Sequence, residues 1–293
     1  MPLVAGISII DSIEELGGRY TAWLVDIWGV MHNGRRAYPD AVAATRAYRA
    51  QGGIVVLLSN SPRPSPSVQE QLRHLGVPDD AYDTTVTSGD LTRHELGKHQ
   101  GAAVYHLGPD RDRPIFHGLD LKLTRHEDAE LVVCSGLFDD ETETPDDYAE
   151  LLRGLAARKL PMICANPDHL VERGDNLVYC AGALAALYER EGGSVVYAGK
   201  PYAPIYLLAL ETIGALAGRE VKRSEVLAIG DGVNTDIAGA AALGIGSVFV
   251  ASGVHAPANS GGDAGGDALD ANHLAELFAQ AGRPLAAMPA LRW

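Results

Sequence analysis

The sequence has few cysteines, no excess of basic residues and no long apolar run. Its three cysteines, Cys134, Cys164 and Cys180, are far apart and have apolar neighbours, so we expect reduced core thiols rather than disulfides or a zinc site. Lys and Arg number 24 against 38 Asp and Glu, a formal net charge of −14, which disfavours binding to nucleic acid or an anionic membrane surface. No apolar stretch approaches the roughly 20 residues that span a bilayer. Because the N-terminal residues also lack the pattern of a signal peptide, we expect a cytoplasmic protein.

Apolar runs of strand length alternate with helical patterns along most of the chain. With 293 residues, 46% of them apolar, the length favours two domains. The runs at 23–27, 54–58, 226–229 and 247–250 are apolar throughout, and helical patterns lie at 39–49, 67–75 and 204–217. This order predicts an α/β fold with a parallel sheet and right-handed crossovers.

A second series of strands and helices interrupts this pattern. It has predicted strands at 102–107, 131–134, 161–165 and 177–180, with helices at 145–157 and 181–190. We therefore predict that residues 98–193 form an inserted domain and that residues 1–97 and 194–293 form the core, which resumes with a strand at 195–197. The ends are predicted to hold a helix over residues 8–17, a surface loop at 256–268 and a short helix from about residue 273.

Four of the predicted core strands end in polar residues. In chain order these are Asp26, Ser59 with Asn60, Lys200, and Asp231 followed by Asp236. The carboxyl ends of parallel strands are where open α/β sheets bind ligands. Each of these motifs taken alone also fits an ordinary turn or cap.

The residue types at these strand ends suit phosphoryl chemistry. Asp26 and Asp231 offer the oxygen ligands that Mg²⁺ prefers. Ser59, the backbone N–H groups after it and Lys200 supply donors and positive charge for a phosphoryl group. A carboxylate placed between a cation and a phosphate can attack phosphorus and form an aspartyl phosphate.

In this order and spacing, the four motifs closely resemble those of the haloacid dehalogenase superfamily of hydrolases. The position of the insertion, the stretch Ala165–Asp168 and the triplet Gly199–Pro201 resemble its class IIA, sugar-phosphatase-like branch. The resemblance implies a doubly wound, Rossmann-like core with an inserted α/β cap domain. It also implies a small phosphorylated metabolite as substrate, and a homodimer formed through the caps.

The resemblance assigns a role to each motif. Asp26 would be the nucleophile, Ser59 and Asn60 would bind phosphate, and Lys200 would also balance the charges of nucleophile and phosphate. Mg²⁺ would be held by Asp26, the main-chain oxygen of Trp28 and Asp231, with Asp236 acting directly or through water. Asn166 and Asp168 of the cap would contact the substrate.

Trp28 departs from the superfamily pattern. Most phosphatases of this superfamily have at this position a second aspartate, which protonates the leaving alkoxide, and positioned acid–base catalysis is typically worth about 10²–10⁴-fold in rate. Another acid, from His32, Asp168 or His169, is one replacement. A leaving group that needs no proton, as in an acyl phosphate or a phosphonate, is a second. A non-catalytic protein that binds metal and a phosphometabolite is the third reading.

Overall fold

The computed structural model describes the chain except for residues 1–6, 174–175, 252–273, 275 and 280–281. The expected surface loop at 256–268 lies outside the described residues, as does the start of the helix expected from residue 273. The chain divides into two compact units. The first unit comprises Met1–Ser59, Gln69–Thr85 and Tyr206–Trp293, and the second unit comprises Asn60–Val68 and Val86–Ile205.

The first unit is built on a seven-stranded sheet with the strand order β1-β14-β13-β12-β2-β3-β4. The neighbouring pairs from β1 to β3 in this order are parallel. The strands are β1 (Ser8–Ile9), β2 (Ala22–Asp26), β3 (Ile54–Ser59), β4 (Thr84–Thr87), β12 (Val226–Gly230), β13 (Gly246–Val250) and β14 (Ala286–Met288).

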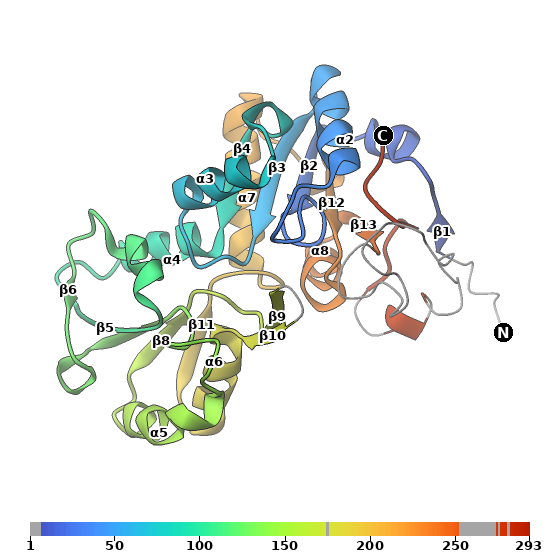
Figure 1. Cartoon of the computed structure of the whole chain (residues 1–293). Helices are drawn as coiled ribbons and strands as arrows, with labels where there is room; N and C mark the ends of the chain where they lie inside the picture. The colour runs from blue at the N-terminus through green and yellow to red at the C-terminus, as the bar shows by residue number, and fades with distance from the viewer. Residues whose placement is uncertain (1–6, 174–175, 252–273, 275, 280–281) are drawn as a thin grey trace. The chain divides into compact units, whose positions relative to one another are not determined.

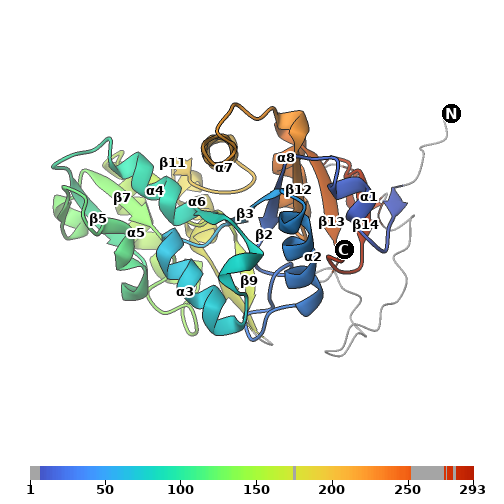
Figure 2. The same ribbon diagram turned by 90° about the horizontal axis from the view of Figure 1, so that it is seen from above.

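The strand order extends from β2 in both directions, which makes the sheet doubly wound. One crossover runs from β2 to β3, and on the other side of β2 the chain runs from β12 to β13. Because crossovers are right-handed, their helices cover opposite faces of the sheet. Seen from above, α2 (Pro39–Ala50) and α8 (Ala238–Ala242) lie on opposite sides of β12 and β13 (Figures 1 and 2). The predicted fold class is confirmed.

The other helices are mostly short. The first unit also contains α1 (Glu14–Gly17), most of α3 (Ser65–Leu75) and of α7 (Ala203–Ala217), the 3₁₀ helices η1 (Asp79–Ala81) and η5 (Arg223–Glu225), and the π-helical turn η6 (Val233–Ile237). The second unit contains α4 (Ser88–Leu96), α5 (Ala149–Ala157) and α6 (Ala181–Arg190), with the 3₁₀ helices η2 (Asp110–Phe116), η3 (His126–Asp128) and η4 (Pro145–Tyr148).

The second unit has its own parallel sheet, ordered β11-β8-β7-β5-β6. Its strands are β5 (Ala103–Leu107), β6 (Lys122–Leu123), β7 (Leu131–Cys134), β8 (Pro161–Cys164) and β11 (Ser194–Tyr197), and a separate antiparallel hairpin joins β9 (Leu170–Arg173) to β10 (Asn176–Tyr179). The proposal that residues 98–193 form an inserted domain stays a prediction, while the compact second unit is wider than that range.

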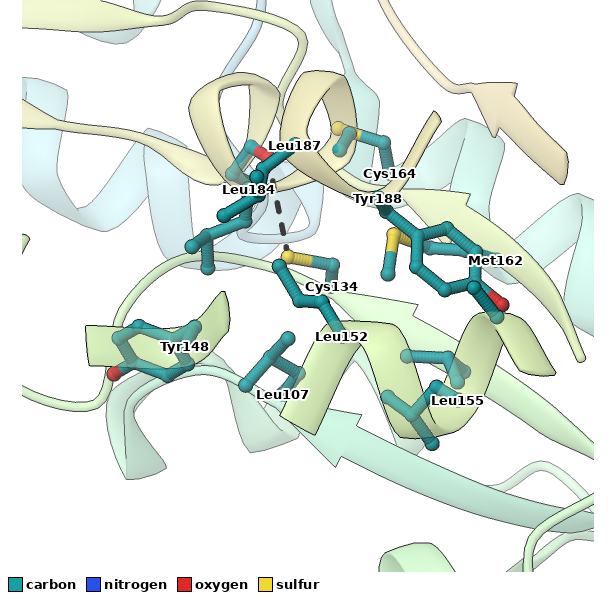
Figure 3. Close-up of a cluster of buried hydrophobic side chains, with 14 of the residues drawn as sticks. Leu107, Cys134, Tyr148, Leu152, Leu155, Met162, Cys164, Leu184, Leu187 and Tyr188 are labelled. Atoms are coloured by element: carbon teal, nitrogen blue, oxygen red, sulfur yellow. Dashed lines mark hydrogen bonds between the residues drawn. The ribbon is translucent and has the colours of Figure 1, made fainter. Parts of the chain in front are cut away.

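Buried thiols lie in the core of the second unit. Figure 3 shows Cys134 and Cys164 among leucine and tyrosine side chains of α5 and α6. Cys134 donates a weak hydrogen bond to the carbonyl oxygen of Ala181 at 3.9 Å, and burial raises the pKa of its thiol to about 12. None of the three cysteines forms a disulfide and all three are buried, as predicted. Burial also raises the pKa of the Cys164 thiol, so Cys134 and Cys164 form little reactive thiolate.

Two predictions about the sheets were wrong. The strand predicted at 195–197 was expected to reopen the core, but the observed strand β11 pairs with β8 in the second unit. The helix expected over residues 8–17 is confined to Glu14–Gly17, because Ser8–Ile9 pairs instead with β14. In the first case the pairing partner differs from the expected one, and in the second case pairing with a remote strand overrides the local helical pattern.

Candidate active site

Asp26 ends the buried strand β2 at the point where the sheet reverses its winding. All five residues of β2 are buried, and Asp26 itself is 8% exposed. The neighbouring strands are β3 and β12, so the side chain lies at a topological switch point, where open α/β sheets bind ligands. The backbone N–H of Ile27 donates to Asp26 Oδ1 at 2.7 Å, which orients the carboxyl group.

The turn after β12 brings two further carboxylates to this edge. Asp231 follows the strand directly, and Asp236 lies in the π-helical turn η6 with 4% of its surface exposed. The N–H of Gly232 donates to Asp236 Oδ2 at 3.1 Å. A Cβ at Gly230 would overlap the Asp236 carboxyl group, so this turn requires glycine there. Single π-helical turns occur frequently at functional sites.

The structure brings Asp26, Asp231 and Asp236 together. One carboxylate oxygen from each lies within 4.8 Å of the others. Three ionised carboxylates this close repel one another unless a cation lies between them. Clustered hard oxygen donors fit Mg²⁺, which is bound through few carboxylates with water and phosphate completing its shell. Their roles as metal ligands stay predictions.

The loop after Asp26 approaches Asp231 closely. Gly29 has φ of +85°, and a Cβ there would overlap Asp231 Oδ2. Its N–H donates to the carbonyl oxygen of His32 at 2.9 Å, which fixes the loop. Gly29 is a site residue that was not predicted, although it lies three residues after the strand-terminal aspartate. The main-chain oxygen of Trp28 stays a predicted ligand.

His32 is a poor candidate for the missing acid. It is 2% exposed, and burial lowers its pKa to about 4, so the ring is neutral near pH 7. Its Nδ1 accepts a hydrogen bond from the N–H of Gly34 at 2.9 Å, which leaves the ring proton on Nε2. A neutral imidazole is a weak proton donor.

Within the second unit, the side chain of Asn60 joins two loops. Asn60 Oδ1 accepts from the N–H of Lys200 at 2.7 Å, and Asn60 Nδ2 donates to the Lys200 carbonyl oxygen at 3.1 Å and to Asp168 Oδ1 at 2.8 Å. Asn60 and Lys200 are 5% and 2% exposed. Both the oxygen and the nitrogen of the amide therefore bind protein partners, which makes Asn60 a positioning group. This role was not predicted from the sequence.

The remaining predicted residues are divided between the two units. Ser59 ends β3 in the first unit and is 9% exposed. Asn166 lies in the second unit, and its Oδ1 accepts from the N–H of Asp168 at 3.0 Å, so it shapes the loop after β8. His169, the other suggested acid, is exposed. Asp26, Asp231 and Asp236 thus meet in the first unit, while Asn60, Asn166, Asp168 and Lys200 gather in the second.

Tyr206 is a supporting residue that no sequence signal indicated. It is 1% exposed, and its hydroxyl group contacts the carbonyl oxygens of Thr235 and Asp236 at 3.1 and 3.2 Å. These contacts hold η6 where it presents Asp236. In the sequence Tyr206 is one more apolar residue of a helical pattern, so its role depends on tertiary contacts.

Fold and site together define an α/β protein with a carboxylate cluster of the kind that holds a divalent cation. A family profile described as haloacid dehalogenase-like hydrolase matches residues 23–122, and a second, described as HAD-hydrolase-like, matches residues 197–277. A crystal structure of a hydrolase of the haloacid dehalogenase-like family from Brucella suis 1330 is 44% identical, covers 96% of this chain and 99% of that one, and superposes with a TM-score of 0.84.

Two named phosphatases are more distant relatives. The acid sugar phosphatase of Staphylococcus aureus (strain USA300) is 28% identical over 239 residues, which is 80% of this chain and 88% of that protein. Glycerol phosphate phosphatase from Mycobacterium tuberculosis, in a crystal structure with magnesium, is 26% identical, covers 84% of this chain and 72% of that one, and has a TM-score of 0.63. The chain belongs to the haloacid dehalogenase-like hydrolases, so the predicted family and enzyme class are confirmed.

Within the described residues, no helix combines the length and apolar character needed to cross a membrane. The cytoplasmic location and the homodimer through the cap stay predictions.

Proposed function

We propose that the protein is a Mg²⁺-dependent phosphatase that hydrolyses a small phosphorylated metabolite through an aspartyl phosphate on Asp26. The observation that carries this proposal is the cluster of Asp26, Asp231 and Asp236 at the switch point, with oxygens within 4.8 Å of one another. The relatives named as phosphatases support it, and the M. tuberculosis relative was crystallised with magnesium and with calcium.

In this proposal Asp26 acts as a nucleophile. Its carboxylate oxygen forms a bond to phosphorus while the bond from phosphorus to the leaving oxygen breaks, and the electron pair departs with that oxygen. A water oxygen then attacks phosphorus, inorganic phosphate leaves, and the Asp26 carboxylate is regenerated. The net reaction converts one phosphate ester and one water into an alcohol and inorganic phosphate.

The other site residues would bind and orient the phosphoryl group. Mg²⁺ would be held by Asp26, Asp231, Asp236 and the main-chain oxygen of Trp28, and when bound it supplies positive charge to the phosphoryl oxygens. Ser59 and Lys200 keep the phosphate-binding roles given by the family resemblance, and Asn60 positions the Lys200 backbone. Asn166 and Asp168 would contact the rest of the substrate.

Trp28 favours a second candidate, a protein that binds metal and a phosphometabolite without turnover. The ten residues from Ile27 to Arg36 contain no carboxylate, and His32 is neutral near pH 7. The loop that supplies the acid in most phosphatases of this superfamily therefore offers no efficient proton donor. A pure binder, however, has no need of a nucleophile at position 26.

Turnover of probes ordered by leaving-group acidity separates the two candidates. Acetyl phosphate, 4-nitrophenyl phosphate and glycerol 3-phosphate would each be assayed with Mg²⁺ and with EDTA, on wild type and on Asp26→Asn. The phosphatase proposal predicts Mg²⁺-dependent turnover that falls from the first two probes to the third and is at least 10³-fold lower in Asp26→Asn, since the nucleophile supplies a covalent route. Tight Mn²⁺ and phosphate binding without any turnover would instead identify a binder.

A further inference from the structure

The indole of Trp28 is exposed although it lies two residues after the proposed nucleophile. It is 36% exposed, whereas Trp23 in the preceding strand is 0% exposed and stacks on Tyr48 with ring centroids 3.9 Å apart and planes 5° apart. Trp23 is an example of an indole that packs in the core of this fold. Trp28 therefore has a free surface that core packing does not explain.

The chain nevertheless holds this exposed indole in one orientation. Its ring lies edge-on to the His32 ring, with centroids 5.2 Å apart and planes at 77°. Bridge pairing joins Trp28 to His32 and His32 to Ala37. Gly34 has φ of +81°, and a Cβ there would overlap the six-membered ring of the indole. A side chain that only contacts solvent would not need the His32 ring, the bridge pairing and Gly34 to fix its orientation.

The chemistry of the same loop limits the leaving group. No carboxylate occurs from Ile27 to Arg36, so the loop offers a leaving oxygen no acidic side chain. Esters of acidic hydroxyl groups can depart without one. Phenols and hydroxylated heteroaromatics combine such acidity with a planar ring, and paired aromatic rings attract each other beyond the area they bury.

We propose that Trp28 is a specificity-determining residue whose indole stacks on a planar aromatic leaving group, so the substrate class is an aryl or heteroaryl phosphate ester. This inference rests on the proposed function and narrows its substrate. As the Asp26 oxygen bonds to phosphorus, the bond from phosphorus to the aryl oxygen breaks, and the aryloxide leaves with the electron pair. Solvent water then protonates the aryloxide when the parent hydroxyl compound is too weak an acid to stay ionised.

The test compares two esters whose leaving alcohols have similar acidity but different shape, phenyl phosphate and hexafluoroisopropyl phosphate. The measured quantity is the ratio of kcat/KM for phenyl over hexafluoroisopropyl ester, because effects on metal or phosphate binding cancel in the ratio. The ratio should favour phenyl in wild type, fall about 2- to 10-fold in Trp28→Leu, and fall less in Trp28→Phe, which keeps a ring. An unchanged ratio in Trp28→Leu would overturn the inference.

A binding measurement makes the outcome independent of turnover. In the Asp26→Asn background with Mg²⁺, calorimetry should show tighter binding of phenyl phosphate than of hexafluoroisopropyl phosphate, and Trp28→Leu should reduce that difference. Turnover with no phenyl preference would refute the role of Trp28 and leave the phosphatase proposal standing. A phenyl preference in binding without turnover would refute the phosphatase proposal and leave the stacking role standing.

Discussion

Trp28 and Gly29 determine much of what the loop after Asp26 can do. The indole occupies the position at which most phosphatases of this superfamily have their acid, and the glycine lets the backbone pass against Asp231. The sequence predicted the absence of the acid, because identity at one position is readable directly. It could not predict how the indole is held, because that depends on His32 and Gly34 folding back on Trp28.

Replacing Trp28 with an acid should change which leaving groups are accepted. In Trp28→Asp we expect turnover of glycerol 3-phosphate to rise by about tenfold or more relative to acetyl phosphate, because a positioned acid assists poor leaving groups most. Steady-state kinetics on variants with wild-type circular dichroism would measure this. A fall for both substrates would show that the indole is needed for structure or binding.

Gly29→Ala should weaken the metal site. The new Cβ would overlap Asp231 Oδ2, so we expect at least tenfold weaker Mn²⁺ binding by electron paramagnetic resonance. Gly52→Ala is the matched control, since Gly52 has a similar φ of +90° but no atom within 4 Å of the added Cβ. Both variants should lose about 1–2 kcal/mol of stability through the left-handed backbone. Equal Mn²⁺ affinity in the two would argue against the overlap.

At the scale of elements, the predicted strands with fully apolar sequences match the structure closely. The cores of β2, β3, β12 and β13 were all located, and their polar ends gave the candidate site. Short strands were missed: β1, β6 and β14 have two or three residues and exist through pairing with remote partners. The bridging role of Asn60 was not predicted for the same reason, since its partners are more than 100 residues away in the sequence.

The amide of Asn60 should be coupled to Asp168. Asn60→Asp would place two carboxylates where a 2.8 Å hydrogen bond now lies, so we expect a loss of about 2–3 kcal/mol in the free energy of unfolding. Adding Asp168→Asn restores a donor and an acceptor across the same gap and should recover about half of that loss. Urea unfolding measures both. Strictly additive losses would show that the two side chains are not coupled.

His106, at the end of β5, should make the second unit sensitive to acid. Its Nε2 lies 2.9 Å from Ser135 Oγ, and burial, followed by Arg113, lowers its pKa to about 4, while Asp110 opposes the shift. The unfolded pKa is 6.5, so its contribution to stability is complete above pH 6.5 and is lost as the pH falls towards 4.

Comparison with a variant isolates this contribution. Between pH 7.5 and 4.5, wild type should lose about 2–3 kcal/mol more of its unfolding free energy than His106→Gln, which cannot titrate. Urea unfolding at the two pH values gives the difference. Parallel losses in both proteins would mean that His106 is not the group responsible.

At the scale of the whole molecule, the family and fold class follow from both sequence and structure, while the activity rests on the carboxylates. The net charge of −14 is compatible with a protein that gathers acidic groups for a cation, although most of these groups lie elsewhere on the chain. The feature of the first unit that supports phosphoryl chemistry is the cluster of Asp26, Asp231 and Asp236. Whether this cluster is catalytic or only binds its ligands depends on whether Asp26 forms a covalent bond to phosphorus.

The most direct test is to trap that bond. Wild-type protein would be mixed with Mg²⁺ and acetyl phosphate, quenched in acid within milliseconds and examined by peptide mass spectrometry. A phosphoryl group on the peptide that contains Asp26, absent in Asp26→Asn and absent with EDTA, is the predicted result. Mg²⁺-dependent hydrolysis that proceeds undiminished in Asp26→Asn, with no phosphorylated peptide in wild type, would contradict the account.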